Sequence, residues 1–326
     1  MYQIPDLQWA QVIDPIGPRP GEILVNIKYS GVCRSDLHIW KGGHEGAGVV
    51  VAIGDGVKDI EMGEHVGVQW INGACGTCEV CAKDGDILRC RKASYSGGTV
   101  DGTFQEYCIC KARSAVRIPK EYDLELVAPV LCAGVTSYKA ILECGAQAGD
   151  LVAIVGAGGG LGSLACQYAK ALGYRVLAVS RGEERRRLCT DQLGVDYFVD
   201  YKSSKDIVTE IQSITPDGPH AVVVVASAME PFQAALQYVR FGGTVVMVGL
   251  PPGGVIMADV MHMVFRTINI KASYVGTREE TEKALEIFFT RKFFPPFQTV
   301  DLKDLPLVFD RMQDGRIGSR IILLSL

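Results

Sequence analysis

The chain has 326 residues, of which 48% are hydrophobic and 21% charged, and its net charge at pH 7 is −4. This length suits about two domains. The composition allows a large core and argues against disorder, and the negative charge disfavours a nucleic acid or an anionic membrane as the main partner. There is no apolar run long enough to span a membrane, and Met1–Leu7 lacks the basic start of a signal peptide. We therefore expect a cytoplasmic protein whose eleven cysteines are metal ligands or buried small side chains.

The first 130 or so residues are rich in glycine and contain short β-like runs at Glu22–Tyr29, Gly48–Ile53 and His65–Ile71. Few helical periods occur among them. Short runs with this periodicity predict an irregular, mostly-β domain.

From about residue 134, apolar strands alternate with helices. The expected strands are Leu151–Val155, Arg175–Val179, Tyr197–Val199, Ala221–Ala226, Thr244–Val248 and Ile268–Ala272. The expected helices are Gly160–Leu172, one from Glu183, one near Asp206–Ser213, and Pro231–Tyr238; Glu279–Phe289 and a final strand, Ile321–Leu324, follow. This alternation predicts an α/β fold with a parallel sheet covered on both faces, and six strands suit a doubly wound dinucleotide-binding fold.

Four cysteines, Cys75, Cys78, Cys81 and Cys90, form the pattern C-x2-C-x2-C-x8-C. Four thiolates this close can surround one Zn²⁺ tetrahedrally, or they can hold an iron–sulfur cluster. A closed four-cysteine site has no open position for chemistry. We therefore predict a structural metal site.

A glycine-rich loop directly follows the expected strand Leu151–Val155 and precedes a helix. In this position the backbone can approach a pyrophosphate, which the free N–H groups of the helix N-terminus then face. The residues expected to bind the cofactor here are Gly156, Gly158, Gly159, Gly160, Leu161 and Gly162.

In dinucleotide-binding folds, the residues at the end of the second strand contact the adenosine ribose of the cofactor, and sites for NAD have a carboxylate at this position. This chain has Ser180 and Arg181, and the basic run Arg185–Arg187 follows. Because Ser and Arg bind a 2′-phosphate that a carboxylate would repel, we predict a preference for NADP(H). The alternative is that Arg181 only stacks on adenine while Glu183 or Glu184 takes the ribose.

A second set of metal ligands is spread along the sequence. Cys33 and His44 lie close together, and Cys132 comes just before the dinucleotide-binding part. Two Cys and one His leave a fourth zinc position open, which is the catalytic pattern.

With these features the chain resembles the zinc-dependent, medium-chain alcohol dehydrogenases of the yeast type, over nearly its whole length. The resemblance is carried by residues 29–38, 43–57, the four-cysteine segment, 131–140, 156–176 and 273–285. It implies a GroES-like, mostly-β catalytic domain at 1–133 and 275–326, and a Rossmann coenzyme-binding domain at 134–274.

The resemblance also implies roles for individual residues. Cys33, His44 and Cys132 would hold a catalytic zinc, and the four-cysteine segment a structural one. Asp36 would orient His44, and Glu45 would approach the metal. Ser35 would accept the substrate proton and pass it towards His38.

For the cofactor, Arg34 and Arg278 would contact the pyrophosphate and Thr136 the nicotinamide ring. Val248 and Leu250 would also contact the cofactor. Leu250 and Trp70 would line the substrate pocket. The expected reaction is hydride transfer between an alcohol, or an aldehyde or ketone, and NADP(H). The alternatives are a biosynthetic reductase of a larger carbonyl compound and a non-catalytic zinc-binding relative. Family members form homodimers or homotetramers by sheet extension in the coenzyme-binding domain.

Two stretches are shorter than the family pattern, near Ile13–Pro15 and between Gly42 and Gly43, where a pocket wall is expected. They are either true deletions or flexible loops that the numbering leaves out. We favour omitted loops, because losing most of a hairpin would expose core. The spacing before Cys90 is also one residue longer than usual, which leaves the fourth thiolate less firmly assigned than the other three.

Overall fold

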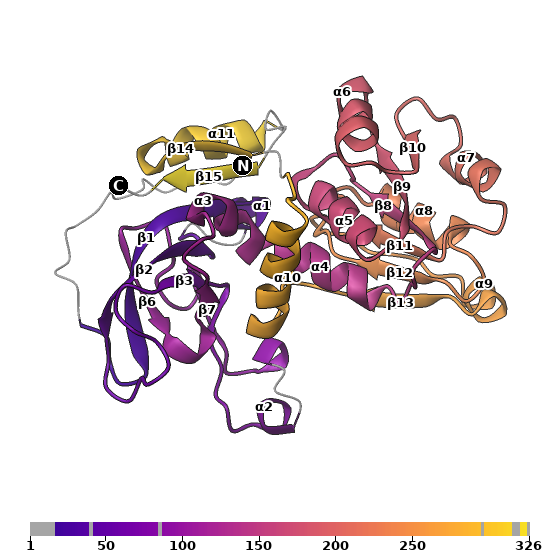
Figure 1. Ribbon diagram of the computed structural model, residues 1–326. Helices are drawn as coiled ribbons and strands as arrows, with labels where there is room; N and C mark the ends of the chain where they lie inside the picture. The colour runs from indigo at the N-terminus through magenta and orange to yellow at the C-terminus, as the bar shows by residue number, and fades with distance from the viewer. Residues whose placement is uncertain (1–16, 39–41, 84–86, 295–296, 315–319, 325–326) are drawn as a thin grey trace.

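The computed structural model describes residues 17–38, 42–83, 87–294, 297–314 and 320–324. Figure 1 shows two lobes, each built around one sheet, with α4 (Ala133–Glu143) and α10 (Arg278–Thr290) between them. The other helices of the first lobe are α1 (Arg34–His38), α2 (Glu79–Lys83), η1 (Ile87–Arg89), η2 (Ala112–Ser114), α3 (Leu124–Val127), η3 (Ala128–Leu131), η5 (Leu302–Asp304) and α11 (Leu305–Gln313).

The first sheet has seven strands, in the order β14-β15-β1-β2-β3-β7, with β6 also paired to β1. Their bounds are β1 (Glu22–Val32), β2 (Gly46–Ile53), β3 (His65–Val68), β6 (Tyr107–Lys111), β7 (Val116–Ile118), β14 (Phe297–Asp301) and β15 (Arg320–Leu324). The final strand predicted from the sequence is β15. It pairs antiparallel with β1, although the two strands lie near opposite ends of the sequence. The C-terminal tail therefore completes the sheet of the first lobe.

The prediction of a single strand at His65–Ile71 is wrong, because this segment contributes to two separate strands. β3 ends at Val68, and β4 (Ile71–Gly73) pairs with β5 (Ser94–Tyr95) in a separate small sheet. Gln69 lies at the break and bonds outside the first sheet. Its carbonyl accepts from Ser96 Oγ at 2.9 Å, and its side chain donates to Thr281 Oγ1 at 2.7 Å.

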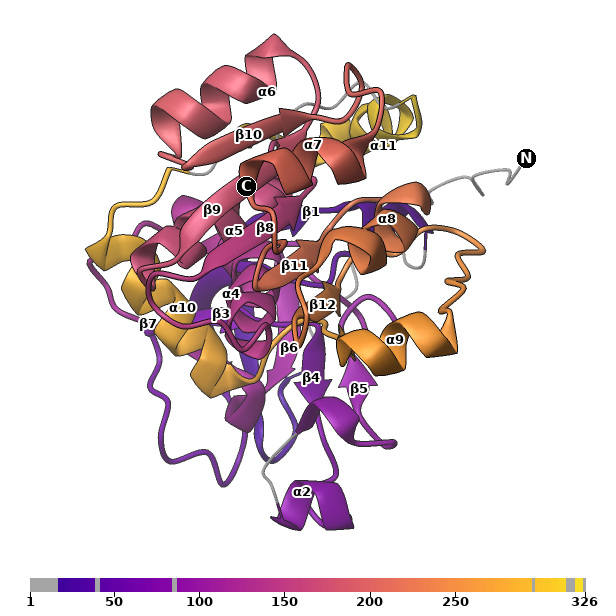
Figure 2. The same cartoon turned by 90° about the vertical axis from the view of Figure 1, so that its right-hand side faces the viewer.

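The second sheet has the six predicted parallel strands in the order β10-β9-β8-β11-β12-β13. Their bounds are β8 (Leu151–Val155), β9 (Arg175–Ser180), β10 (Tyr197–Asp200), β11 (Ala221–Val224), β12 (Thr244–Met247) and β13 (Asn269–Ala272). The order reverses between β8 and β11, as in doubly wound dinucleotide-binding folds. Figure 2 shows helices on both sides of this sheet. The helices are α5 (Gly160–Ala171), α6 (Glu183–Arg187), η4 (Leu188–Gln192), α7 (Ile207–Ile214), α8 (Glu230–Tyr238) and α9 (Val260–Arg266).

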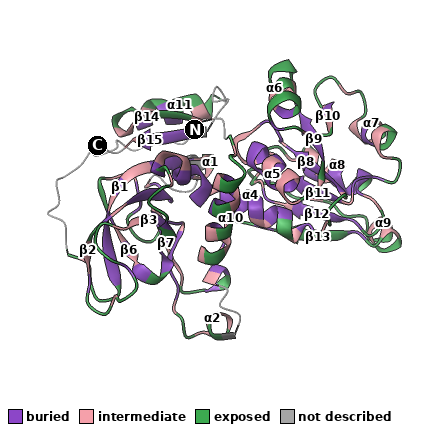
Figure 3. Cartoon of the chain, in the orientation of Figure 1, coloured by how far each residue is buried: buried purple, intermediate pink, exposed green. Residues whose placement is uncertain are grey.

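One hydrophobic cluster contains residues of both lobes, and Figure 3 shows buried segments in both sheets and in α4. It includes Leu131 beside the first sheet, Tyr168 on α5 and Phe288 on α10, all almost fully buried. The Tyr168 hydroxyl donates to the carbonyl of Ala284 at 3.0 Å, which ties α5 to α10. Burial of this extent fixes α4, and with it Cys132, between the sheets.

Among the described residues, no single helix has the length and apolar character needed to cross a bilayer. The bent pair Leu124–Leu131 and Ala133–Glu143 meets those criteria only when taken together.

The chain runs without a break from Gly42 to Gly43, so the stretch there is truly shortened and the omitted-loop interpretation is wrong. The carbonyl oxygens of Gly42 and Gly43 accept bonds from the backbone N–H groups of Phe104 and Thr103 at 3.2 and 3.1 Å. Gly43 has φ +71°, and a Cβ there would overlap the Phe104 ring. Glycine therefore allows the short connection to pack directly against Thr103 and Phe104. The other short stretch, near Ile13–Pro15, lies outside the described residues.

Candidate active site and metal centres

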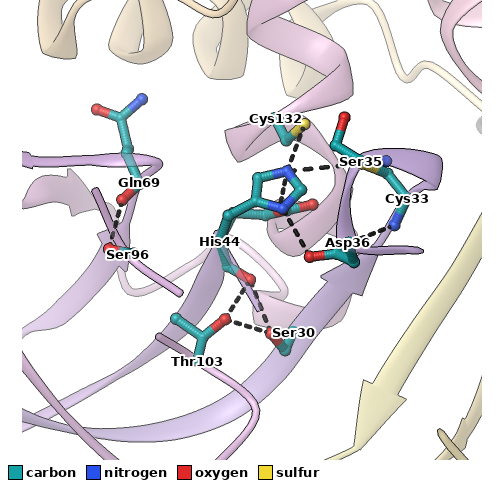
Figure 4. Close-up of polar contacts among 10 residues, drawn as sticks. Ser30, Cys33, Ser35, Asp36, His44, Gln69, Ser96, Thr103 and Cys132 are labelled. Carbon is teal, nitrogen blue, oxygen red and sulfur yellow. Dashed lines mark hydrogen bonds and ion pairs between the residues drawn. The ribbon is translucent and has the colours of Figure 1, made fainter. Parts of the chain in front are cut away.

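The three predicted catalytic ligands meet between the lobes (Figure 4). Cys33 follows β1, His44 precedes β2, and Cys132 stands at the N-terminus of α4. His44 Nε2 lies 3.2 Å from Cys132 Sγ and 3.6 Å from Cys33 Sγ, and all three donor atoms lie within 4.8 Å of one another. Two soft sulfurs and an imidazole in this arrangement fit a zinc ion.

Two buried carboxylates surround the His44 ring. Asp36 Oδ1 lies 2.8 Å from Nδ1, and its other oxygen accepts from the Cys33 backbone N–H at 2.8 Å. Glu45 Oε2 lies 2.8 Å from Nε2. Asp36 therefore fixes the ring so that Nε2 faces the thiols, as ligating histidines require. Gly31 leaves room for this packing, since a Cβ there would overlap the Glu45 carboxylate.

The electrostatics of the pocket favour a cation. Burial disfavours a charged imidazole, but the negative groups around it, Glu45 first and then Asp36, raise the pKa of His44 well above its usual value. Burial acts in the opposite direction on the Asp36 carboxyl group and raises its pKa to about 7. Negative groups that attract a proton onto His44 would attract a divalent metal ion to the same place.

Two hydroxyl groups that we did not predict hold the ligand segment in place. Ser30 Oγ and Thr103 Oγ1 both donate to the carbonyl of Glu45 at 2.8 Å, and they lie 2.5 Å from each other. All three residues are buried. Ser30 and Thr103 are far apart in sequence, so no local pattern could have revealed them.

Other predicted residues surround the ligands. Ser35 is on α1, and its backbone N–H donates to Cys33 Sγ at 3.2 Å. Arg34 is exposed on the same helix, while the side chain of His38 lies outside the described part of the chain. Trp70 packs edge-on against His44 at 5.7 Å between ring centroids, and its other side packs against Tyr95 at 5.0 Å.

The four-cysteine segment forms a lobe of its own. Sulfur–sulfur distances are 3.4 Å for Cys78 and Cys81, 3.6 Å for Cys90 and Cys75, and 3.9 Å for Cys75 and Cys81. The four sulfurs lie within 4.8 Å of one another, so the longer spacing still brings Cys90 into the set. Backbone N–H groups of Thr77 and Cys78 lower the pKa of Cys75 to about 5. This geometry fits a closed tetrahedral metal site.

The glycine loop lies at the carboxyl end of β8. Gly156 has φ +94°, which favours glycine, and a Cβ on Gly162 would overlap Gly156. The N–H of Gly158 points towards Ser180 Oγ at 3.3 Å. Gly159 is the N-cap of α5, so the N-terminus of this helix opens onto the loop as predicted.

The basic residues after β9 have different surroundings. The side chain of Arg185 lies across the loop, where a Cβ on Gly158 would come within 2.8 Å of it. Arg186 and Arg187 instead pair with Glu183 at 3.6 and 3.3 Å. Arg181 is exposed. The structure thus places Arg185, and not its two neighbours, at the phosphate loop.

The remaining predicted cofactor residues lie on the two helices between the lobes and at the end of β12. Thr136 is buried on α4, one turn after Cys132, and Val248 is buried just after β12. Leu250 is 67% exposed. Arg278 begins α10, and its Nε lies 2.9 Å from Glu282.

A surface cavity of about 360 Å³ lies elsewhere, on the first lobe. It is lined by Pro20, Gly21, Gly56, Val57, Asp59, Lys111, Ala112 and Arg113. None of the predicted site residues lines it. We assign no function to it.

Comparisons with known proteins agree with this geometry. Residues 19–120 match the family described as alcohol dehydrogenase GroES-like domain, and residues 160–290 match zinc-binding dehydrogenase. Alcohol dehydrogenase 1 of Emericella nidulans is 48% identical over 98% of both chains, and that of Neurospora crassa is 45% identical over 99% of this chain and 98% of its own.

Two solved structures share the fold. Acetophenone reductase from Geotrichum candidum, in complex with NAD, is 28% identical with a TM-score of 0.81, covering 95% of this chain and 91% of its own. The protein CAD from Helicobacter pylori, complexed with NADP(H), is 25% identical with a TM-score of 0.82, covering 94% of this chain and 92% of its own. The two family matches, and relatives that are 45% and 48% identical over nearly the whole chain, show that the chain belongs to the zinc-dependent, medium-chain alcohol dehydrogenase family, and the metal ligands and the dinucleotide fold agree with this.

Proposed function

We propose that this alcohol dehydrogenase prefers NADP(H) to NAD(H). The observation that carries the proposal is the end of β9, where Ser180 and Arg181 stand in place of an acidic residue and Arg185 lies across the glycine loop. A 2′-phosphate would gain charge-assisted hydrogen bonds there. Asp200, the carboxylate at the end of β10, accepts from the backbone N–H of Gly182 at 2.8 Å, so it is engaged in holding the turn.

In the reaction, a zinc ion bound by Cys33, His44 and Cys132 would supply Lewis acidity that polarises the substrate oxygen. Asp36 holds the His44 ring through Nδ1 and so keeps Nε2 directed at the metal position. We propose that the Ser35 hydroxyl accepts the substrate proton and passes it towards His38. Trp70 would bound the substrate on one side.

We further propose that both metal positions hold zinc, giving two zinc ions per chain, and that the enzyme also reduces aldehydes or ketones. A second candidate function is reduction of a larger carbonyl compound. The direct link between Gly42 and Gly43 favours it, because this short connection lies flat on Thr103 and Phe104 and leaves less chain to wall the substrate side. Comparing small and bulky alcohols and carbonyls as substrates tests this; a strict preference for ethanol-sized substrates would refute it.

For assembly, we propose a homodimer or homotetramer built by sheet extension. β13 is an edge strand whose residues are all exposed, and neighbouring α9 exposes apolar side chains. These side chains, Val260, Met261, Val264 and Phe265, are 66% to 75% exposed. A second copy would cover both.

We also propose the domain division at 1–133 with 275–326 and at 134–274. A cytoplasmic location, which the sequence predicts, remains a proposal. The eleven cysteines, all within the described residues, form no disulfide, which is consistent with a reducing compartment.

The cofactor proposal is tested by kcat/KM with each dinucleotide at equal concentrations. We expect NADP(H) to be favoured, and Arg181→Ala to reduce that preference about 10-fold or more, since a hydrogen bond to a charged group contributes roughly 1.5–3 kcal/mol. Arg187→Ala is the matched control, because Arg187 pairs with Glu183. A clear preference of the native enzyme for NAD(H) would end the proposal.

A further inference from the structure

A tyrosine connects the four-cysteine lobe to the start of α10. Tyr274 follows β13, and its hydroxyl donates to the carbonyl of Leu88 at 2.7 Å, across 186 residues of sequence. Leu88 is buried and lies two residues before Cys90. Tyr274 is 46% exposed, so burial of its ring does not by itself explain its position. The hydroxyl thus joins the crossover between the lobes, residues Ser273–Thr277, to the segment that supplies the fourth thiolate.

The next residue of the crossover has a strained backbone. Val275 has φ +37°, in the left-handed region that β-branched residues rarely adopt. Such conformations persist only where the surroundings hold them, and they gather at functional sites. The bond of Tyr274 holds one side of Val275. On the other side, Thr277 caps α10 and exchanges hydrogen bonds with Glu280 in a capping box.

The crossover also contacts the helix that carries a catalytic ligand. Gly276 packs against Val135 so closely that a Cβ would overlap that side chain. Val135 is on α4, beside Thr136 and one turn after Cys132. A shift of Gly276 would therefore displace the N-terminal turn of α4 or open a gap beside it.

A second tie joins α10 to the other wall of the site. Thr281 Oγ1 accepts from Gln69 Nε2 at 2.7 Å, and both residues are buried. Gln69 precedes Trp70, whose ring packs edge-on against His44. The crossover and the first turn of α10 therefore contact both sides of the catalytic site, and the hydroxyl of Tyr274 bonds the crossover to the four-cysteine lobe.

We propose that Tyr274 is a positioning residue: through it, the four-cysteine lobe holds the crossover against α4 and so sets the geometry in which the nicotinamide end of the cofactor binds. The lobe then contributes to cofactor affinity as well as to stability. The inference goes beyond the proposed cofactor preference, because it applies to whichever dinucleotide the enzyme binds more tightly.

The test compares Tyr274→Phe with Tyr107→Phe, a tyrosine of matched exposure, 44%, on β6. NADPH and NADH are titrated by fluorescence, and the tighter of the two is used for both variants. We expect Tyr274→Phe to raise the Kd about 3- to 10-fold, the range of one lost hydrogen bond, with kcat at saturating cofactor within about twofold. Zinc content should stay at the native value. An unchanged Kd, or equal changes in the two variants, would overturn the proposal.

A rescue separates positioning from general destabilisation. In Tyr274→Phe/Val275→Gly, glycine can keep the left-handed backbone without the bond that holds it. We expect the Kd to return to within about twofold of the native value, which a merely structural role of Tyr274 would not produce. A double variant as weak as Tyr274→Phe would contradict the route through Val275. A native preference for NADH would refute the proposed cofactor choice and leave this comparison intact.

Discussion

The four thiolates of the structural lobe come from one short segment, with Cys75 and Cys90 only 15 positions apart, whereas His44 and Cys132 of the catalytic set are separated by 88. The lobe lies largely at the surface, and three of its four cysteines are partly exposed. In the catalytic set Cys33 and Cys132 are also partly exposed, but His44 is buried together with the carboxylates of Asp36 and Glu45. The same metal-binding chemistry is thus placed in two environments.

This difference indicates what each centre contributes. A closed four-sulfur site would organise a small lobe that has little core of its own, so a metal bound there would act mainly through folding. In the three-ligand site, hydrogen bonds of Asp36, Ser30 and Thr103 hold the His44–Glu45 segment without help from a metal ion. A zinc ion held there by three protein ligands would keep a fourth position for substrate.

The largest expected effect comes from removing a catalytic ligand. His44→Ala takes away the nitrogen ligand and the imidazole that the buried carboxylates of Glu45 and Asp36 contact. We expect activity to fall to background, and zinc content to fall from two ions to one because the lobe keeps its own. Atomic absorption with steady-state assays checks both. Activity above one-tenth of the native value would show that the ligand assignment is wrong.

The second-largest effect is expected when the four-cysteine lobe loses one of its thiol ligands. Cys90→Ser should lower the melting temperature by roughly 10 °C, because a structural metal contributes folding free energy directly. Differential scanning fluorimetry measures this shift, and activity at saturating cofactor should stay within about threefold at temperatures well below melting. If kcat instead fell as far as in His44→Ala while the melting temperature stayed constant, the division of roles between the centres would be refuted.

A smaller effect is expected at the residue that orients the ligand. Asp36→Asn should lower activity or zinc affinity about 10- to 100-fold, the usual cost of losing the carboxylate partner of a ligating histidine. Competition with a zinc chelator measures the affinity. Asp206→Asn is the matched control, since Asp206 also accepts backbone N–H bonds but caps α7 far from the metal ligands. Equal effects of the two variants would argue against an orienting role.

The smallest effect concerns thiol reactivity in the zinc-free protein. Backbone N–H groups lower the pKa of Cys75 to about 5, whereas burial raises the pKa of Cys108 to about 12. Since the thiolate is the nucleophile, labelling of Cys75 by iodoacetamide should rise with pH through about 5 and then level off. Cys108 should remain unlabelled until the protein unfolds. Peptide mass mapping across pH reads this out, and labelling of Cys75 that only begins near pH 8 would contradict it.

Much of the fold could be predicted from periodicity. The strand at Leu151–Val155 matches its predicted bounds, and the other five parallel strands are displaced by only one or two residues at their ends. β14 was missed, because its exposed residues carry little apolar alternation and its pairing with β15 depends on the rest of the sheet. The break after Val68 was missed because Gln69 and Trp70 leave the sheet to contact α10 and His44.

Local spacing by itself determined the four-cysteine lobe and the glycine loop, because the four thiol donors lie within 15 positions of one another and the N–H groups of the loop are contiguous in sequence. Only the tertiary structure decided that Ser30 and Thr103 hold Glu45, that Arg185 and not Arg186 lies at the phosphate loop, and that Tyr274 reaches Leu88. Those contacts join residues far apart in sequence or select among identical side chains, and the packing of the two lobes settles which groups meet.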